Sequence, residues 1–279
     1  MTLLLHASDP HFGTERSAAV DALVQLVHEQ RPDVLLLSGD ITQRATHLQF
    51  ESARAFVARL QVPAILAIPG NHDIPLFNLA ARLISPYARY MHAFGRDLEP
   101  EFENDEVLVL TLNTTRRYRH VDGALSNAQI ERVARRLELA RPAQWRMVLM
   151  HHPVAVTREQ DRHNLLHGHA AAVQRWAAAG ADLLAGGHIH LPFVLPLRDH
   201  WPHLPRAMWA LQAGTAVSTR VRADAGNSVN IIRLGASAPA LDTTAGALRH
   251  CVIERWDHTA TNQRFERVQT LSLSSAPST

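Results

Sequence analysis

Aspartate, histidine and asparagine side chains gather in five short clusters along the chain. In chain order, the clusters are Ser8-Asp9-Pro10-His11, Ser38-Gly39-Asp40, Pro69-Gly70-Asn71-His72-Asp73, His151-His152-Pro153 and Gly186-Gly187-His188-Ile189-His190. Imidazole is the commonest metal ligand and titrates near neutral pH. Mixed nitrogen and oxygen ligands suit Mn, Fe or Zn rather than a metal held by soft thiolates. The clusters therefore predict metal-dependent chemistry.

Each cluster taken alone has a simpler structural interpretation. An Asp-x-His or Gly-Asp pair is often a surface turn, and Asn-His-Asp can cap a helix. The Gly-His-x-His unit is more specific, because it puts two imidazoles on one side of an extended segment. All five clusters together, in this order and each after an apolar run, are hard to explain as turns.

The elements that must position these clusters are short, continuous apolar runs, which are typical of strands buried on both faces of a sheet. The runs are Leu3–Leu5, Val34–Leu37, Ala64–Ile68, Val107–Leu112, Met147–Met150 and Leu183–Ala185. Helical periodicity lies between them, at Val20–Val27, Phe50–Leu60, Ile130–Leu137 behind a Ser126-x-x-Gln129 capping box, and Val173–Ala177. Alternating strands and helices predict an α/β layered fold. Five of the strands deliver their clusters at carboxyl ends, where open α/β sheets carry their sites.

The C-terminal part of the chain has a different pattern, in which helical periodicity fades and short strands follow. We expect strands at Met208–Gln212, Val229–Leu234, Cys251–Trp256 and Phe265–Leu271, with a loop at Gly235–Ala247. Residues 1–271 are expected to form a single domain, and residues 272–279 a disordered tail. Two further loops, Val154–His167 and Leu191–Arg206, carry Arg, His and Pro near strand ends and could shape a pocket.

The composition excludes several kinds of chemistry. All 28 basic residues are arginine, which excludes a P-loop and the lysine-dependent Schiff-base and pyridoxal enzymes. The single cysteine, Cys251, excludes a disulfide framework and an iron–sulfur cluster, and we expect it to be a small core residue. The arginines are dispersed, so nucleic acid is expected only as a substrate. The N-terminal segment resembles no signal peptide and no run spans a membrane, so we expect a cytoplasmic protein.

The ordered set of clusters resembles the calcineurin-like metallophosphoesterase superfamily. Its pattern of Asp-x-His, Gly-Asp, Gly-Asn-His-Asp/Glu, His and Gly-His-x-His is complete here between residues 9 and 190. Within this superfamily, the chain resembles the branch of class III cyclic-nucleotide phosphodiesterases in two segments, Leu37-Ser38-Gly39-Asp40-Ile41-Thr42 and Gly214-Thr215-Ala216. The resemblance implies a four-layer α/β/β/α sandwich, with two mixed sheets flanked by helices and two divalent or trivalent metal ions in the cleft.

The resemblance also implies a role for each matching residue. Asp9, His11, Asp40 and His190 would bind one metal, and Asp40, Asn71, His151 and His188 the other, with Asp40 bridging the two ions. His72 would contact the phosphate or protonate the leaving group, and Asp73 would orient His72.

Residue chemistry is consistent with these roles. Two metals about 3.5–4 Å apart can share a hydroxide, lower its pKa and stabilise the attacking and leaving oxygens. Two divalent ions, two aspartates and one hydroxide leave a formal charge of +1, which favours an anionic phosphoryl group.

The expected function is therefore a metal-dependent phosphoesterase, foremost a phosphodiesterase that attacks phosphorus with a metal-bridging hydroxide. The substrate would be a cyclic nucleotide or another phosphodiester. A nuclease, a phosphomonoesterase, a nucleotide–lipid pyrophosphatase and a non-catalytic metal-binding scaffold stay open as alternatives, and so does a homo-oligomer.

Residues next to the clusters have expected roles as well. His152 is expected to support the ligands by packing rather than to bind metal. His163, His167 and His169 could touch substrate, and one arginine of the group Arg116, Arg117 and Arg119 could clamp phosphate, because this group follows Asn113 at a strand end.

Overall fold

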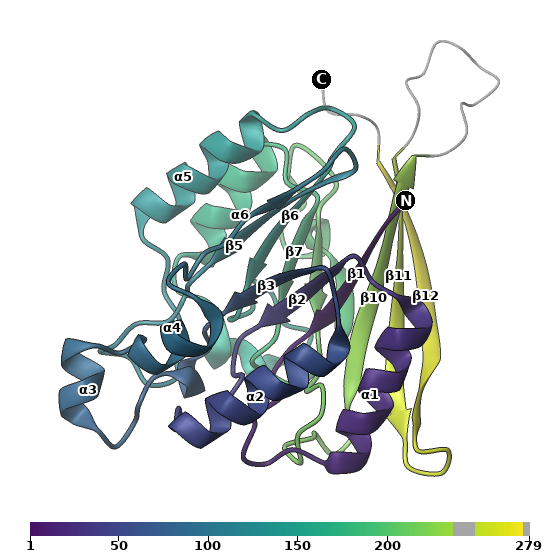
Figure 1. The fold of residues 1–279 in the computed structure, drawn as a ribbon. Coiled ribbons are helices and arrows are strands. Elements are labelled where there is room, and N and C mark those ends of the chain that lie inside the picture. The colour runs from purple at the N-terminus through teal and green to yellow at the C-terminus, as the bar shows by residue number, and fades with distance from the viewer. Residues whose placement is uncertain (237–248, 276–279) are drawn as a thin grey trace.

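The computed structural model describes residues 1–236 and 249–275, and twelve strands of these residues form two six-stranded sheets (Figure 1). The first sheet, in the order β12-β11-β10-β1-β2-β3, contains β1 (Thr2–Ala7), β2 (Val34–Ser38), β3 (Ala64–Ile68), β10 (Ser228–Ala236), β11 (Arg249–Thr259) and β12 (Arg264–Ser275). The second sheet, in the order β4-β5-β6-β7-β9-β8, contains β4 (Phe102–Glu103), β5 (Val107–Leu112), β6 (Trp145–Met150), β7 (Leu183–Gly186), β8 (Phe193–Pro196) and β9 (Trp209–Gln212). Strands β1 to β3 run parallel, and so do β5, β6, β7 and β9. Each parallel set therefore ends at one edge of its sheet.

Helices cover the outer face of each sheet. On the first sheet, α1 (Ser17–Gln30), α2 (His47–Leu60) and α4 (Ala88–Phe94) pack in one apolar cluster. On the second, α5 (Asn127–Glu138) and α6 (His169–Ala178) do the same. The two inner faces pack against each other through wholly buried side chains such as Leu4, Leu36 and Met147. The predicted four-layer α/β/β/α sandwich is confirmed.

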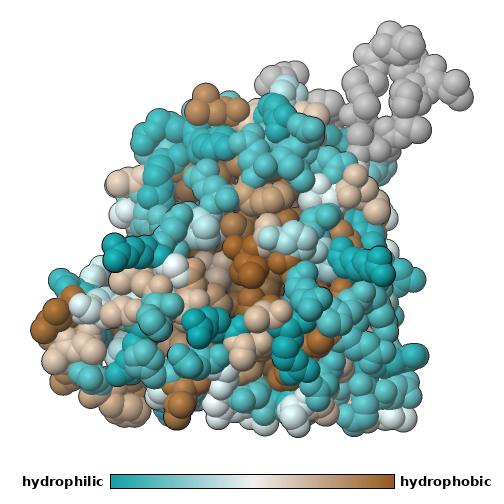
Figure 2. All heavy atoms as spheres, viewed as in Figure 1, coloured by the Kyte–Doolittle hydropathy of each residue, from teal (hydrophilic) through white to brown (hydrophobic). Residues whose placement is uncertain are grey.

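Local sequence explains where the elements begin. Helix α5 starts at the expected capping box, in which Ser126 and Gln129 bond each other's backbone amides. The short α3 (Leu79–Ile84) projects from the body and carries exposed Leu83 and Ile84. Figure 2 shows further hydrophobic residues in the middle of the same face. Among the described residues, no helix combines the length and the apolar character needed to cross a membrane.

Several predicted boundaries were wrong. Strand β12 continues to Ser275, so residues 272–275 pair with β11 instead of belonging to a disordered tail, and residues 276–279 lie outside the described part. Strand β10 runs to Ala236, and most of the expected Gly235–Ala247 loop also lies outside it. Pairing with the long strand β11 extends β10 and β12 beyond the apolar segments that predicted them.

The two loops expected to shape a pocket contain regular structure of their own. A 3-10 helix (Glu159–Asn164) lies in the first, and strand β8 with a second 3-10 helix (Leu197–Asp199) lies in the second. Together they line a cavity of about 360 Å³ that includes His169 and Trp201. None of the predicted metal ligands lines this cavity, so it is separate from the site described next.

Candidate metal centre

Four of the predicted ligands meet at the carboxyl ends of β1, β2 and β7. The imidazole Nε2 atoms of His11 and His190 are 3.1 Å apart, and Asp9 Oδ1 lies 3.8 and 3.3 Å from them. Asp40 Oδ2 is 3.7 Å from His11 Nε2. Ligands about 2.1 Å from one ion lie roughly 3.0–3.4 Å apart in octahedral or tetrahedral geometry. The cluster therefore has the dimensions of a site for one metal ion.

A second cluster adjoins the first and shares Asp40. The Nε2 atom of His151 lies 3.4 Å from Asp40 Oδ1, 3.2 Å from Asn71 Oδ1 and 3.2 Å from His188 Nδ1. Asp40 thus turns one carboxylate oxygen toward each cluster. This is the arrangement that a carboxylate bridging two cations requires.

A buried oxygen without a hydrogen-bond donor shows that the cluster suits a cation. Asp9 is wholly buried, and its Oδ1 accepts no hydrogen bond from any described residue. A buried carboxylate oxygen left without a partner is costly, and buried charges are normally paired or bind metal. Two divalent cations would satisfy Asp9 and would be held by neutral imidazoles and the Asn71 amide.

Unusual backbone geometry is concentrated at the same place. Five ligand residues adopt positive φ angles of 45° to 71°, and they are Asp9, His11, Asp40, His188 and His190. Such angles cost about 1–3 kcal/mol each in non-glycine residues and tend to mark functional sites. Close approach of the strand ends adds a further constraint, since a Cβ on Gly70 would lie 2.1 Å from the Asp40 amide nitrogen. The backbone is therefore strained at the positions from which these side chains converge.

Backbone carbonyl groups orient two of the histidines. His151 Nδ1 donates to the carbonyl oxygen of Ser38 (2.8 Å), and His190 Nδ1 donates to that of Arg220 (2.6 Å). Each ring consequently presents Nε2 to the cluster, as is usual for metal-ligating histidines. The Thr215 hydroxyl donates to the carbonyl of Asp9 (2.6 Å) and so supports the first strand end.

The protonation states agree with a cation site. Burial lowers the pKa values of His11 and His188 to about 3, so both imidazoles are neutral and able to bind metal. Burial also disfavours charge on His151 and Asp40, but their mutual attraction outweighs it, raising the pKa of His151 to about 9 and holding that of Asp40 well below its usual range. A cation bound between them would take the place of the proton on His151.

His72 lies beside the first cluster. Its backbone amide donates to Asp40 Oδ1 (2.8 Å), its Nδ1 donates to the carbonyl oxygen of Gln43 (3.0 Å), and its ring packs edge-on against His11. The Nε2 atom is left facing the site. Distances alone would also admit His72 as a ligand together with His11 and Asp40.

The hydrogen bonds of Asp73 differ from those that its expected role requires. Its carboxylate accepts hydrogen bonds from the amides of Gly70 (2.9 Å), Ile41 (3.0 Å) and Thr42 (2.8 Å) and from the Thr42 hydroxyl (2.8 Å), not from His72. The carbonyl of Gln43 orients His72 instead. Asp73 braces the turn that carries Asp40, because it faces inward from the short 3-10 helix Asn71–Asp73.

His152 is buried behind the ligands. Its two ring nitrogens bond the Thr114 hydroxyl (2.7 Å) and the Val121 carbonyl (2.8 Å), and its ring packs 4.6 Å from that of His188. Both nitrogens are therefore used, which agrees with the supporting role expected from the sequence.

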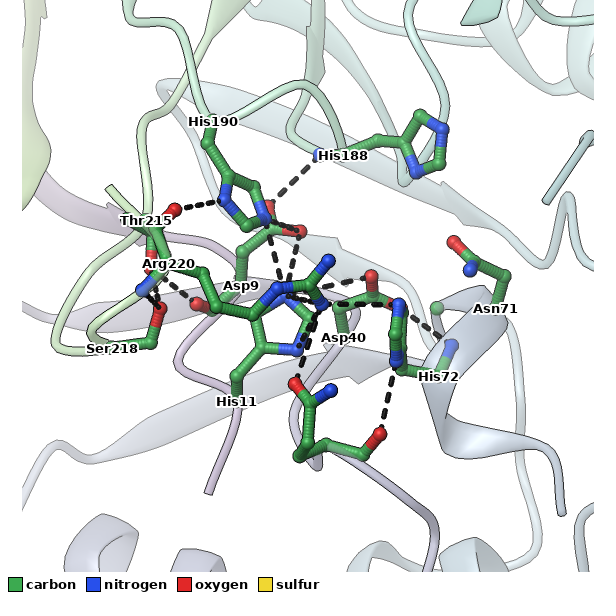
Figure 3. A network of polar contacts seen from close by, with 12 residues as sticks. Asp9, His11, Asp40, Asn71, His72, His188, His190, Thr215, Ser218 and Arg220 are labelled. Carbon is green, nitrogen blue, oxygen red and sulfur yellow. Dashed lines mark hydrogen bonds and ion pairs between the residues drawn. The ribbon is translucent and has the colours of Figure 1, made fainter. Parts of the chain in front are cut away.

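The expected phosphate-clamping arginines bond other groups. Arg116 bonds Gln129 and nearby carbonyls, Arg117 bonds the Leu83 carbonyl, and Arg119 lies against Asp122 and His167. The arginine that contacts the candidate ligands is Arg220, in the loop between β9 and β10 (Figure 3). No sequence signal singles it out, although the Gly214-Thr215-Ala216 segment lies nearby in the sequence.

Comparisons with known proteins agree with this geometry. A probable cyclic nucleotide phosphodiesterase from Synechococcus sp. is 30% identical over 187 residues, which are 65% of this chain and 66% of that protein. A glycerophosphodiester phosphodiesterase from Enterobacter lignolyticus is 34% identical over 82 residues, which are 25% of this chain and 29% of that protein. The chain thus matches less than two thirds of the length of either relative.

The fold has a solved counterpart. The crystal structure of a dimetal phosphatase from Danio rerio aligns with a TM-score of 0.65 at 13% identity, over 97% of this chain and 98% of that one. Residues 2–192 match the calcineurin-like phosphoesterase family, and this range contains every predicted ligand. The chain therefore belongs to the calcineurin-like phosphoesterase family.

Proposed function

We propose that the chain is a phosphodiesterase that hydrolyses a P–O bond at the two clusters joined by Asp40. The observation that carries this proposal is the Asp40 carboxylate, whose two oxygens face His11 and His151 separately. When bound, two cations would supply an activated hydroxide and offset the negative charge that develops on the phosphoryl oxygens. The metal ligands would be the seven predicted residues, namely Asp9, His11, Asp40, Asn71, His151, His188 and His190.

The charge of the ligand set favours an anionic substrate. Asp9 and Asp40 are its only acidic members, since Asn71 stands where a third carboxylate could have neutralised the site. The formal surplus of +1 left by two divalent ions and a hydroxide would attract an anionic phosphoryl group.

His72 is placed to act on the leaving oxygen. Because Nδ1 donates to the Gln43 carbonyl, the neutral ring has its lone pair on Nε2, on the side of the ligands. A proton taken up at Nε2 makes this atom the donor to the departing alkoxide. The bond from the His72 amide to Asp40 holds the ring in position relative to the bridging carboxylate.

The names of the relatives support a diester rather than a monoester. Both are named as phosphodiesterases, one of cyclic nucleotides and one of glycerophosphodiesters. A cyclic nucleotide is the substrate we propose, with Mn, Fe or Zn as the metals and the cytoplasm as the location. The complete ligand set argues against the non-catalytic scaffold, because a scaffold has no need of His72 or of a strained backbone at five ligands.

The test is turnover by protein loaded with Mn²⁺ or Zn²⁺. An aryl phosphodiester, the matching monoester and 3′,5′-cyclic AMP are compared for the wild type, Asp40→Ala and His72→Ala, with metal content measured for each. We expect the wild type to bind two metals and to prefer the diesters. Asp40→Ala should lose metal, and His72→Ala should keep both metals while kcat falls about 100-fold or more.

Two results would contradict the proposal. One is wild-type protein that binds two metals and hydrolyses only the monoester. The other is loss of metal from His72→Ala, which would make His72 a ligand rather than the residue that assists the leaving group.

A further inference from the structure

Arg220 reaches over the candidate metal ligands from the solvent side. The residue is exposed, whereas His11 directly beneath it is wholly buried. Its Nη1 lies 3.3 Å from both ring nitrogens of His11, 3.1 Å from His72 Nε2 and 3.3 Å from Gln43 Oε1. Figure 3 shows the side chain crossing His11 toward His72. The guanidinium therefore stands at the entrance to the site.

The positive charge of Arg220 is not balanced by a carboxylate. In residues 1–236 and 249–275, no aspartate or glutamate forms an ion pair with it, and its Nε and Nη2 make no hydrogen bond. Arg222 differs in this respect, since it pairs with Asp161 at 3.0 Å. Two of the three guanidinium nitrogens of Arg220 are thus available to a ligand of opposite charge.

The backbone of Arg220 is tied to the metal cluster. Its amide donates to the Ser218 hydroxyl (3.1 Å), and its carbonyl accepts the bond from His190 Nδ1. Ser218 in turn bonds Thr215, whose hydroxyl holds the Asp9 carbonyl. The segment that orients two ligands therefore also sets the point from which the Arg220 side chain extends.

We propose that Arg220 is a substrate-binding residue that pairs with the non-bridging oxygens of the phosphoryl group. A guanidinium offers parallel N–H donors that match two phosphoryl oxygens, which an ammonium group cannot do. Cations held by His11 would repel the guanidinium, and an anionic group between them would offset this repulsion. The ligand class is a phosphate ester or inorganic phosphate, and the inference rests on the function proposed above.

The alternative is that Arg220 only braces His190 through its backbone. The two roles are separable, because substitution of the side chain leaves the carbonyl bond in place. The variants are Arg220→Gln, Arg220→Lys and, as a control that removes one positive charge from an exposed ion pair between helices α1 and α2, Arg59→Gln, whose partner is Asp21.

The measurement is calorimetric titration of the Mn²⁺-loaded proteins with inorganic phosphate, together with metal content and kcat and KM for the aryl diester. For Arg220→Gln we expect two metals per chain, phosphate affinity about 10- to 100-fold lower, and a KM raised by a similar factor. Arg220→Lys should recover only part of the affinity, because it restores the charge without the paired donors. Arg59→Gln should stay within about twofold of the wild type.

Distinct results would overturn the inference. Wild-type phosphate affinity in Arg220→Gln with both metals retained would show that the side chain does not bind the anion. Loss of metal from both Arg220 variants would make the side chain a brace for the ligands. If the wild type holds two metals but neither hydrolyses an ester nor binds phosphate, the proposed function itself fails, and this inference fails with it.

Discussion

Replacing Asp73 by asparagine tests whether this carboxylate braces the turn that carries Asp40 or orients the His72 ring. In the structure, Asp73 is buried and accepts four hydrogen bonds, three from the amides of Gly70, Ile41 and Thr42 and one from the Thr42 hydroxyl. The Asp73→Asn side chain has the same shape but keeps one acceptor oxygen, and its NH₂ group must face N–H or O–H donors. At least one backbone amide then loses its partner.

The size of the effect follows from the bonds lost. Hydrogen bonds to charged groups contribute about 1.5–3 kcal/mol each, and a buried donor left unsatisfied costs about 1–3 kcal/mol more. We therefore expect Asp73→Asn to lower the free energy of unfolding by about 3–5 kcal/mol. In a chain of this size that corresponds to a fall in Tm of about 6–10 °C. Metal affinity should fall too, because the braced turn carries Asp40.

The assay is thermal and urea unfolding of metal-free protein, followed by metal titration. Thr42→Val is a control that removes the hydroxyl bond to the same carboxylate (2.8 Å) and leaves the three amides paired with it, while the Ala45 amide loses the hydroxyl as its acceptor (3.1 Å). It should cost about 1–3 kcal/mol, less than Asp73→Asn, because the carboxylate keeps its bonds to the three amides. The stability lost in the double variant of Asp73→Asn with His72→Ala should equal the sum of the losses in the two single variants, because the Asp73 carboxylate and the His72 ring are not bonded.

The opposite pattern would refute this reasoning. If Asp73→Asn unfolds within about 1 kcal/mol of the wild type and lowers kcat only while His72 is present, Asp73 acts through His72. The role implied by the family resemblance would then be the right one.

Three further predictions follow from buried groups. Burial lowers the pKa of His6 to about 4, whereas the unfolded chain takes up this proton near pH 6.5, so stability falls as the pH falls between these values. Between pH 7.5 and 4.5, the free energy of unfolding of metal-free His6→Gln, measured with urea, should therefore fall by about 2–3 kcal/mol less than that of the wild type. Equal decreases in the two proteins would show that His6 does not cause the pH dependence. Asp182 is buried against Arg249 (2.7 and 2.9 Å) and Arg206 (2.6 Å), so Asp182→Asn should cost about 3–5 kcal/mol in urea unfolding. Its metal content should not change, since Asp182 precedes β7 and the ligands follow this strand. Asn71→Asp should keep both metals but raise KM for the diester about tenfold or more, because it cancels the surplus charge; an unchanged KM would contradict the charge argument.

The sequence predicted the strands that carry the ligands because these strands are buried on both faces. Continuous apolar runs such as Val34–Leu37 and Val107–Leu112 can be recognised without knowledge of their neighbours. The strand ends were harder, because β12 is extended to Ser275 by its pairing with β11 and not by its own composition. The two-residue β4 has too few residues to show a period.

The parts of the candidate site that depend on the order of residues in the chain could be predicted from the sequence. The parts that depend on how distant segments pack together could not. The cluster Asn71-His72-Asp73 could be noticed in the sequence, but the direction of the Asp73 side chain depends on amides from another strand end. Arg220 could not be singled out among 28 arginines, since its importance arises from a loop that folds back over His11. The arginines near Asn113 have the right chemistry, but their guanidinium groups bond other protein groups, among them Gln129, the Leu83 carbonyl and His167.

The central claim is that two metal ions share Asp40. It is tested most directly by a crystal structure of Mn²⁺-loaded protein with an anomalous difference map. We predict two peaks about 3.5–4 Å apart, one near Asp9, His11 and His190 and the other near Asn71, His151 and His188, with Asp40 touching both. A single peak, or two peaks of which only one contacts Asp40, would contradict the claim.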